Sequence, residues 1–250
     1  MDPRETSVVK VVAVIPARYG STRFPGKPLA TISGKPLLQW VWEGAKQSRL
    51  INDLLVATDD SRIAQAAERF GAQVVMTRPD HPSGTDRISE AAQGRAADWI
   101  LNLQGDEPLI TGEFLDLWIR SLSPKFDMAT VATPLRETLD LSRPEVVKVR
   151  WDESGKALGF RRAVPPGEAD EWRHQHVGLY AYRLATLARF VSLPPSEGEK
   201  QEKLEQLRAL ENGIAVQVVP LTFLSVGVDT PGDVTRAERA LAERAGSVPT

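Results

Sequence analysis

One stretch decides the fold: Val8-Val-Lys-Val-Val-Ala-Val-Ile15, followed by Pro16-Ala-Arg-Tyr-Gly-Ser-Thr-Arg-Phe-Pro-Gly-Lys27. An apolar run so rich in β-branched residues is typical of a strand that is buried on both faces. The basic segment after it, interrupted by Gly and Pro, is therefore a loop at the end of that strand. Because open α/β sheets bind ligands beyond the carboxyl ends of their strands, this loop is the predicted binding site.

The loop combines three cations with two glycines. Arg18, Arg23 and Lys27 supply two guanidinium forks and one ammonium. Gly20 and Gly26 let backbone N–H groups approach a ligand closely. We interpret the loop as a triphosphate cradle, although its glycine spacing fits neither the dinucleotide motif nor the motif ending in Gly-Lys-Ser/Thr. A solvated basic loop is the alternative, since Arg and Lys usually lie on the surface.

The composition limits the classes of protein to consider. The 250 residues include 31 Lys and Arg against 33 Asp and Glu, so the formal net charge is −2. Broad binding to nucleic acid or to membranes needs a basic surface, so we expect neither partner. Cysteine is absent, which excludes disulfides and thiolate metal sites and suits a reducing cytoplasm. The polar residues 1–7 and the interrupted apolar run predict neither a signal peptide nor a membrane span.

Strand and helix patterns alternate along the first half of the chain. After a helix that begins at Pro36, the expected strands are 53–58, 73–77, 99–104 and 127–133, and the expected helices between them are 63–70, 88–97 and 111–121. This order predicts an α/β fold with a Rossmann-like, doubly wound, mostly parallel sheet. The length suits a single domain, which we place at 8–245 with tails at 1–7 and 246–250.

The middle of the chain changes character. A β-hairpin is expected at 146–161, a mobile loop at 164–172, and a strand at 176–182 with His176, Tyr180 and Tyr182 on one face. We interpret about 146–183 as a small antiparallel insert, available for substrate contact and dimer pairing. A charged helix at 199–210 and a strand at 215–219 follow it.

Two further segments place polar residues at predicted strand ends or helix starts. Ser83 and Gly84 precede a helix, where they suit either binding of a base or phosphate or simple N-capping. Asp106 and Glu107 follow the strand 99–104, where carboxylates supply oxygen ligands for a phosphate-bound Mg²⁺; a plain turn is the alternative.

A helix-start signature stands near the end of the chain. Thr230 fits an N-cap, Pro231 the first helical position, and Asp233 the residue that returns to the cap. This assignment leaves Asp229 just outside the cap, and the residues alone favour a simple cap neighbour, since Asp is common beside helix starts.

Six motifs can now be taken together: Ile15-Pro-Ala-Arg-Tyr-Gly-Ser-Thr-Arg-Phe-Pro-Gly-Lys27, Ala57-Thr-Asp59, Ser83-Gly-Thr-Asp-Arg87, Asn102-Leu-Gln-Gly-Asp-Glu-Pro108, Lys203-Leu-Glu-Gln-Leu-Arg208 and Val228-Asp-Thr-Pro231. In order and spacing they resemble the cytidylyltransferases that activate 3-deoxy-manno-octulosonate (Kdo) for lipopolysaccharide assembly. The similarity runs from about Val11 to about Leu241. It implies a fold of the nucleotide-diphospho-sugar transferase type and a cytoplasmic homodimer.

The resemblance also implies a reaction and its residues. The anomeric hydroxyl of Kdo would attack the α-phosphate of CTP, giving CMP-Kdo and pyrophosphate, with Mg²⁺ as the only cofactor. The implied catalytic residues are Lys27, Arg18 and Asp106, and the implied metal ligands are Asp106 and Asp229. The implied nucleotide contacts are Ala17, Arg18, Arg23, Lys27, Ser83, Gly84 and Gln104. The implied sugar contacts are Arg162, His176, Tyr180, Glu205 and Gln206.

The chain departs from the family pattern on the sugar side. Gly159-Phe-Arg-Arg-Ala-Val-Pro-Pro166 places Arg161 where the family usually has Ser, and the loop behind it is short and acidic. Glu197-Gly198 replaces a usual Pro-Leu pair. A related acid sugar, such as the 8-amino analogue of Kdo or a nonulosonate, is therefore the alternative substrate. An inactive CTP-binding regulator is an alternative of another class, against which the retained Lys27, Asp106 and Asp229 argue.

Overall fold

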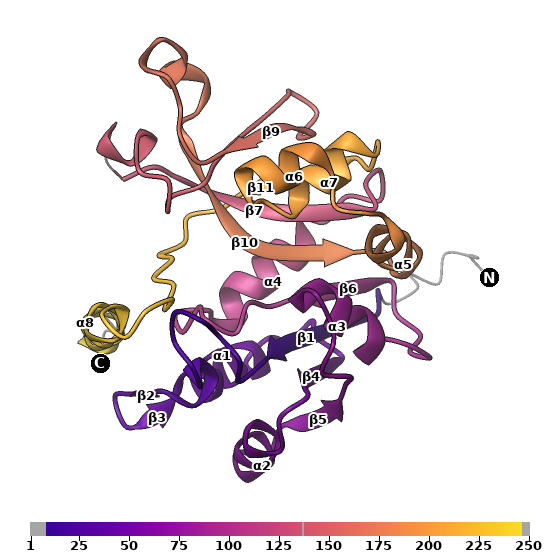
Figure 1. The fold of residues 1–250 in the computed structure, drawn as a ribbon, viewed down its shortest axis with the longest axis vertical. Helices are drawn as coiled ribbons and strands as arrows, with labels where there is room; N and C mark the ends of the chain where they lie inside the picture. Colours follow the sequence, from indigo (N-terminus) through magenta and orange to yellow (C-terminus); the bar gives the residue numbers. More distant parts are fainter. Residues whose placement is uncertain (1–8, 137, 247–250) are drawn as a thin grey trace, which may run out of the picture.

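A computed structural model describes residues 9–136 and 138–246; the predicted tail 1–7, Val8 and residues 247–250 lie outside the described residues. Within them, a nine-stranded sheet has the order β11-β7-β10-β6-β1-β4-β5, with β8 and β9 attached through β10 (Figure 1). The strands that run parallel to one another are β1 (Val11–Ala17), β4 (Asp53–Thr58), β5 (Gln73–Met76), β6 (Trp99–Asn102), β7 (Met128–Pro134) and β11 (Val216–Pro220).

The central strand β1 is buried on both faces, as its apolar run predicts. Val11, Ala13 and Ile15 belong to one apolar core, and Val12 and Val14 belong to the other. All five side chains are fully buried. The sheet therefore separates two cores, each of which needs its own layer of helices.

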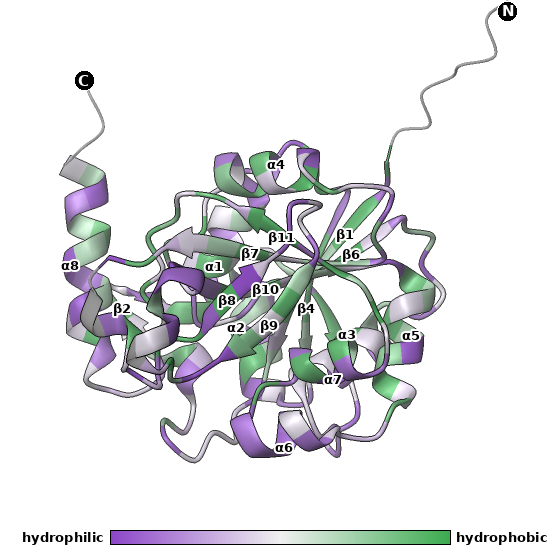
Figure 2. Cartoon of the chain, turned by 90° about the horizontal axis from the view of Figure 1, so that it is seen from above, coloured by the Kyte–Doolittle hydropathy of each residue, from purple (hydrophilic) through white to green (hydrophobic). Residues whose placement is uncertain are grey.

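Helices cover both faces of the sheet. The first core receives apolar residues from α1 (Leu37–Lys46), α2 (Ser61–Arg69), α4 (Gly112–Arg120) and α8 (Asp233–Gly246). The second receives them from α3 (Gly84–Ala91), α5 (Leu184–Ser192) and α7 (Gln206–Glu211). Figure 2 shows apolar central strands between helices that carry their polar residues outward. The predicted doubly wound, mostly parallel α/β fold is confirmed.

The position of β10 (His174–Tyr182) differs from the expected insert. The hairpin of β8 (Lys148–Trp151) and β9 (Ala157–Arg161) is antiparallel as predicted. However, β10 lies inside the main sheet, antiparallel to both β6 and β7. Its side chains are buried on both faces, with Leu179 in one core and Tyr182 in the other, so it can occupy a central place. The sequence pattern identified the strand but not its neighbours.

The segment expected as one helix at 199–210 is broken, so that prediction is wrong. It forms α6 (Glu197–Glu202) and α7, separated by Lys203 in the left-handed region at φ 53°. The expected mobile loop at 164–172 contains a 3₁₀ helix, η3 (Pro166–Glu171), and ends in the fully buried Trp172. Both differences arise from tertiary contacts described below.

The remaining elements are short. They are η1 (Lys27–Leu29), β2 (Thr31–Ile32), β3 (Lys35–Pro36) and η2 (Thr138–Leu141). From β11 the chain crosses the molecule to reach α8, which lies beside the β2–β3 hairpin (Figure 1). Among the helices of residues 9–136 and 138–246, none has the length and apolar character that spanning a membrane requires.

Candidate functional site

The loop after β1 holds Lys27 in a fixed turn. Gly26 has φ 71° and precedes η1, and a Cβ there would lie 3.0 Å from the ring of Tyr19, so both conformation and space require glycine. Gly20 faces open space and has no such requirement from the protein itself. Arg18 is exposed and forms no hydrogen bond or ion pair with any described residue, so its guanidinium is available to a ligand.

Lys27 joins two carboxylates that are far apart in the sequence. Its Nζ atom lies 2.9 Å from Asp106 Oδ2 and 3.2 Å from Asp229 Oδ1. Arg23 Nη2 also lies 3.2 Å from Asp229 Oδ1. The side chain of Lys27 is 18% exposed, that of Asp106 26% and that of Asp229 47%, so the cluster opens to solvent on one side.

The charge on Lys27 is secured by this arrangement. Burial disfavours the charged ammonium, but Asp106 and Asp229 together outweigh that effect and raise the pKa of Lys27 above its ordinary value. Lys27 is therefore a permanent cation at neutral pH, suited to binding phosphate oxygens as a point charge.

Backbone contacts hold the two carboxylates together. The amide of Val228 donates to the carbonyl of Asp106 at 2.9 Å, which fixes the 223–229 segment against the loop after β6. Asp233 Oδ2 accepts from the amides of Asp229 and Thr230, which confirms the predicted return to Thr230, although α8 begins at Asp233 and not at Pro231. The cap thus uses the Asp233 carboxylate and leaves that of Asp229 to face Lys27.

Glu107 does not join the exposed carboxylates. It is buried, and its Oε1 accepts from Ser225 Oγ at 2.6 Å. Burial, with a smaller contribution from the charge of Asp106, raises the pKa of Glu107 to about 8. Largely protonated at neutral pH, Glu107 links the same two segments without adding a negative charge to the Asp106–Asp229 pair.

Asp106 and Asp229 fit a magnesium ion that shares its coordination with phosphate. Their oxygen atoms converge on one point, where both meet the same ammonium. The described residues contain no cluster of three or more His, Cys, Asp or Glu that could hold a metal alone. Mg²⁺ commonly takes one or two carboxylates and completes its shell with water and substrate phosphates, so this donor set suits it.

The predicted nucleotide contacts lie around the ends of β1 and β6. These strands are adjacent and parallel, which places Ala17 and Gln104 at one edge of the sheet. A Cβ on Gly84 would lie 3.4 Å from Pro16, so the start of α3 approaches the same edge. Ser83 caps α3 by accepting from the amides of Thr85 and Asp86, which confirms the capping alternative and leaves its base contact a prediction. We call this group, with the 18–27 loop and Asp106, the nucleotide side.

The predicted sugar contacts, here called the sugar side, are half-buried or buried: Arg162, His176, Tyr180, Glu205 and Gln206. Glu205 connects it to the nucleotide side, because its Oε2 accepts from Thr85 Oγ1 at 2.6 Å and its carboxylate also faces Ser83. Burial raises the pKa of Glu205. Glu205 Oε1 and Gln206 Nε2 are buried and have no hydrogen-bond partner among the described residues. Such atoms need a ligand or water, which suits a polyhydroxylated substrate.

His176 is held as a neutral ring. Burial lowers its pKa to about 3, and its Nε2 lies 2.9 Å from Thr130 Oγ1. The single proton of that hydroxyl goes to the carbonyl of Leu179 at 2.8 Å, so Thr130 accepts from Nε2 and leaves Nδ1 as an acceptor. The ring of Tyr180 lies 5.5 Å from that of His176. Thr130 was missed by sequence reasoning, because its role depends on the pairing of β7 with β10.

Arg162 is less free than its predicted role suggests. Its Nε donates to the carbonyl of Glu202 at 2.6 Å, its Nη1 to that of Pro144 at 2.9 Å, and its Nη2 to that of Lys203 at 3.0 Å. These bonds satisfy carbonyls at the end of α6 and account for the break in the predicted helix. Two N–H groups remain for a carboxylate, so the predicted sugar contact stays a prediction.

The unusual Arg161 lies on the other face of β9. Its Nη1 bonds Glu168 Oε2 at 2.6 Å, and its guanidinium lies 5.1 Å from the ring of Trp172. Phe160, one position earlier, instead contacts the ring of His176 edge-on at 5.0 Å. Because neighbouring strand residues face opposite ways, Arg161 points away from His176. Two of the three departures from the family pattern, Arg161 and the acidic loop, therefore pair with each other.

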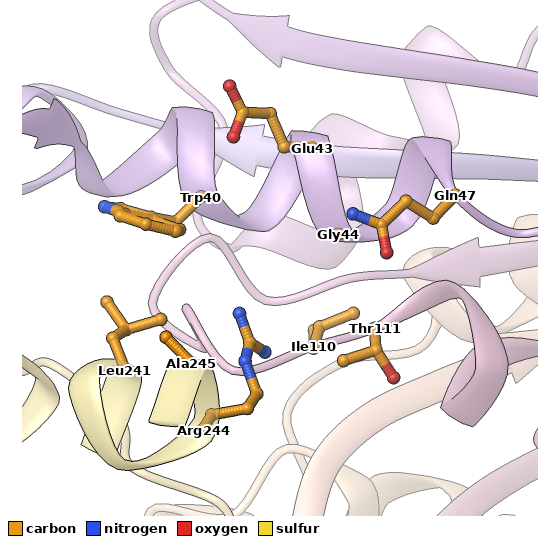
Figure 3. A pocket seen from close by; sticks show the side chains of 9 residues that line it. All are labelled: Trp40, Glu43, Gly44, Gln47, Ile110, Thr111, Leu241, Arg244 and Ala245. Atoms are coloured by element: carbon orange, nitrogen blue, oxygen red, sulfur yellow. The ribbon is translucent and has the colours of Figure 1, made fainter. Parts of the chain in front are cut away.

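A cavity of about 330 Å³ lies elsewhere, between α1, α8 and the start of α4 (Figure 3). Arg244 reaches from α8 toward α1 and donates to the carbonyl of Leu109 at 3.0 Å. None of the predicted site residues lines this cavity. It is distinct from the sheet edge where those residues gather.

Comparison with known proteins adds to this geometry. Residues 12–217 match the cytidylyltransferase family. Proteins named 3-deoxy-manno-octulosonate cytidylyltransferase from Pelobacter propionicus and Geobacter sulfurreducens are each 46% identical to this chain, with 92% and 91% of this chain and 96% and 98% of those proteins covered. A solved structure of CMP:2-keto-3-deoxy-manno-octonic acid synthetase complexed with CTP has a TM-score of 0.88 and 39% identity, covering 94% of this chain and 99% of that one.

Proposed function

This chain belongs to the cytidylyltransferase family, and we infer that it transfers CMP from CTP to the anomeric hydroxyl of Kdo, releasing pyrophosphate. The observation that carries this proposal is the single cluster of Lys27, Asp106 and Asp229 at the end of β1. In-line displacement at phosphorus depends on alignment and neutralisation of charge, and needs no covalent nucleophile. The cluster supplies a fixed cation and two carboxylates for that purpose.

On the nucleotide side, each cation has a separate task. The exposed Arg18 and Arg23 would bind the outer phosphates as guanidinium forks. Lys27 would contact the α-phosphate and stabilise the charge that develops toward the leaving pyrophosphate. Ala17, Ser83, Gly84 and Gln104 would bind the base and ribose at the same sheet edge.

We propose Mg²⁺ as the cofactor, held by Asp106 and Asp229. When bound, it would neutralise phosphate charge and lower the pKa of the sugar hydroxyl. Lys27 already bonds both carboxylates, so it would turn from them toward the phosphates as the substrate enters.

On the sugar side, neutral groups suit the hydroxyls of Kdo. His176 offers Nδ1 as an acceptor, and Gln206 Nε2 and Glu205 Oε1 have bonding capacity that the described residues do not use. Because Arg161 faces Trp172 and Glu168, its substitution for serine gives no reason to prefer another acid sugar. Kdo is therefore the proposed substrate.

Two further features belong to this proposal. We expect a homodimer and a cytoplasmic location, as in the resemblance stated above. Sedimentation of the purified protein would test the first, and a particle of monomer mass at working concentration would contradict it.

The function is tested by pyrophosphate release from CTP and Mg²⁺, measured side by side with Kdo, with its 8-amino analogue and with no sugar. We expect release with Kdo that stops when the metal is chelated. Release only with the amino analogue would keep the transfer but change the sugar. CTP binding without release on any acid sugar would favour an inactive regulator.

A further inference from the structure

A second cation lies buried next to the sugar side. Lys148 on β8 has no exposed surface. Its ammonium is surrounded by main-chain carbonyls, those of Asp140 at 3.1 Å, Arg143 at 2.9 Å, Val146 at 2.6 Å and Arg162 at 2.5 Å. Burying an ammonium is costly unless its protons are all bonded, and here carbonyl oxygens fill that need.

The four carbonyls come from two separate segments. Asp140, Arg143 and Val146 belong to the turn before β8, and Arg162 follows the end of β9. Removing the ammonium would take its donor from the carbonyls of Val146 and Arg162, while those of Asp140 and Arg143 would keep backbone amide donors. Backbone pairing between β8 and β9 would persist. Lys148 therefore fastens the turn to the residue after the hairpin.

The chain of contacts continues through the side chain of Arg162. Its guanidinium bonds the carbonyl of Pro144 in the same turn and the carbonyls of Glu202 and Lys203 at the break between α6 and α7. Lys203 adopts the left-handed conformation that turns the chain there. Glu205 and Gln206 follow within three residues; Gln206 Nε2 has no hydrogen-bond partner among the described residues, and Glu205 Oε1 has only an ion pair with Arg208 at 3.8 Å.

We propose that Lys148 is a positioning residue for recognition of the acid sugar. It fixes Arg162, and through Arg162 it fixes the turn from which Glu205 and Gln206 reach the substrate. This inference rests on the proposed function, because it names the part of that site which Lys148 organises. Lys148 itself contacts no substrate.

Kinetic separation of the two substrates tests the proposal. In the full-length enzyme, Lys148→Met should raise KM for Kdo by about tenfold and leave KM for CTP within about twofold, because only the sugar side loses its support. Val149→Ala, a buried change at the neighbouring position of β8, is the control for general loosening of the strand. It should change neither the KM for Kdo nor the KM for CTP. Equal effects on both KM values, or none on the KM for Kdo, would overturn the proposal.

A double variant tests the path through Arg162. Arg162→Ala should raise KM for Kdo by a similar factor, and adding Lys148→Met to it should bring little further change. If the fold-changes in KM for Kdo of the two single variants multiply in the double variant, Lys148 does not act through Arg162. If Lys148→Met fails to fold, Lys148→Arg replaces it, because a planar fork cannot reproduce the ammonium's bonds to four converging carbonyls.

Hydrogen exchange separates failure of this inference from failure of the proposed function. Amides of residues 203–208 should exchange faster in the Lys148 variant than in wild type or Val149→Ala, with or without substrate. Faster exchange in the Lys148 variant, together with a wild type that does not use Kdo, would retain the positioning role and reject the substrate. If the wild-type enzyme uses Kdo, but Lys148→Met changes neither the exchange of these amides nor the KM for Kdo, the positioning role is rejected.

Discussion

The nucleotide side and the sugar side handle charge in opposite ways. On the nucleotide side, Arg18, Arg23 and Lys27 are at least partly exposed, and two of them meet carboxylates directly. On the sugar side, Lys148 and Arg162 direct their protons to backbone carbonyls, and His176 is neutral. If the proposed function is correct, one region supplies charge for the reaction, while the other uses its charges to hold backbone segments together around the sugar.

The largest effect should come from removing a carboxylate that we propose as a metal ligand. Asp106→Asn should lower kcat by about 10²–10³-fold, because it removes charge where the reaction concentrates it, and it should hardly change thermal stability. The assay is Mg²⁺-dependent pyrophosphate release. Asp116→Asn is the matched control, because that carboxylate accepts bonds from Ser48 and nearby amides far from the site. If the Asp106→Asn variant kept near-normal activity, Asp106 would not be a metal ligand.

Truncating the central cation should have the next largest effect. Lys27→Ala should lower kcat by about 10²-fold with a smaller change in KM for CTP, if its charge acts chiefly in the transition state. Steady-state rates over a range of CTP concentrations measure both constants. Lys46→Ala, which removes a lysine lying over Trp42, controls for loss of a cation elsewhere. An effect confined to KM would assign Lys27 to ground-state binding.

A sugar-side change should act more gently and on one substrate. Glu205→Gln should raise KM for Kdo by about tenfold and leave KM for CTP nearly unchanged, because the buried carboxyl loses acceptor capacity but keeps its volume. Glu197→Gln, at an exposed residue paired with Lys200, is the control. If Glu205→Gln raised the KM for CTP as much as the KM for Kdo, the nucleotide side and the sugar side would not act separately.

Titration of His176 should have the smallest effect on catalysis, but it should change the stability of the fold measurably with pH. Because the pKa of His176 falls from an ordinary 6.5 to about 3 on folding, the unfolded state binds the proton first as pH drops. The neutral ring stabilises the folded state fully above about pH 6.5, and this stabilisation is lost as the pH falls toward 3. By pH 4.5 the loss of unfolding free energy is about 3 kcal/mol.

The pH effect is measured by urea unfolding of wild type and His176→Gln between pH 7 and pH 4.5. The substitution should flatten the dependence of unfolding free energy on pH. His174→Gln is the control, because burial lowers the pKa of His174 as well, but that ring is less buried, so its effect should be smaller. Identical slopes for wild type and His176→Gln would show that the ring titrates normally.

The same contrast explains how much the sequence could predict. The nucleotide side follows local rules: a buried strand places Lys27 in the loop at its end, and a capping signature separates Asp229 from Asp233. These rules placed Asp106 at a strand end and Asp229 beside a helix cap, but only the family resemblance brought Asp229 to the same site as Asp106. The roles of the residues toward CTP and Mg²⁺ stay predictions.

The sugar side depends on contacts between distant segments, which local patterns do not contain. Residues 176–182 are recognisable as a strand, but nothing in them states that β6 and β7 lie on either side. The break at Lys203 needs the guanidinium of Arg162 to bind its carbonyl. Lys148 and Thr130 gave no signal, since a lysine and a threonine in strands are ordinary until their partners are known.

The crossing of the chain from β11 to α8 has a consequence for synthesis on the ribosome. Asp229 meets a lysine 202 positions earlier, and the crossing segment delivers it to the loop after β6. A nascent chain that has folded its nucleotide loop and most of its sheet still lacks one carboxylate. We therefore expect a product that ends before Asp229 to be inactive even where its sheet has folded.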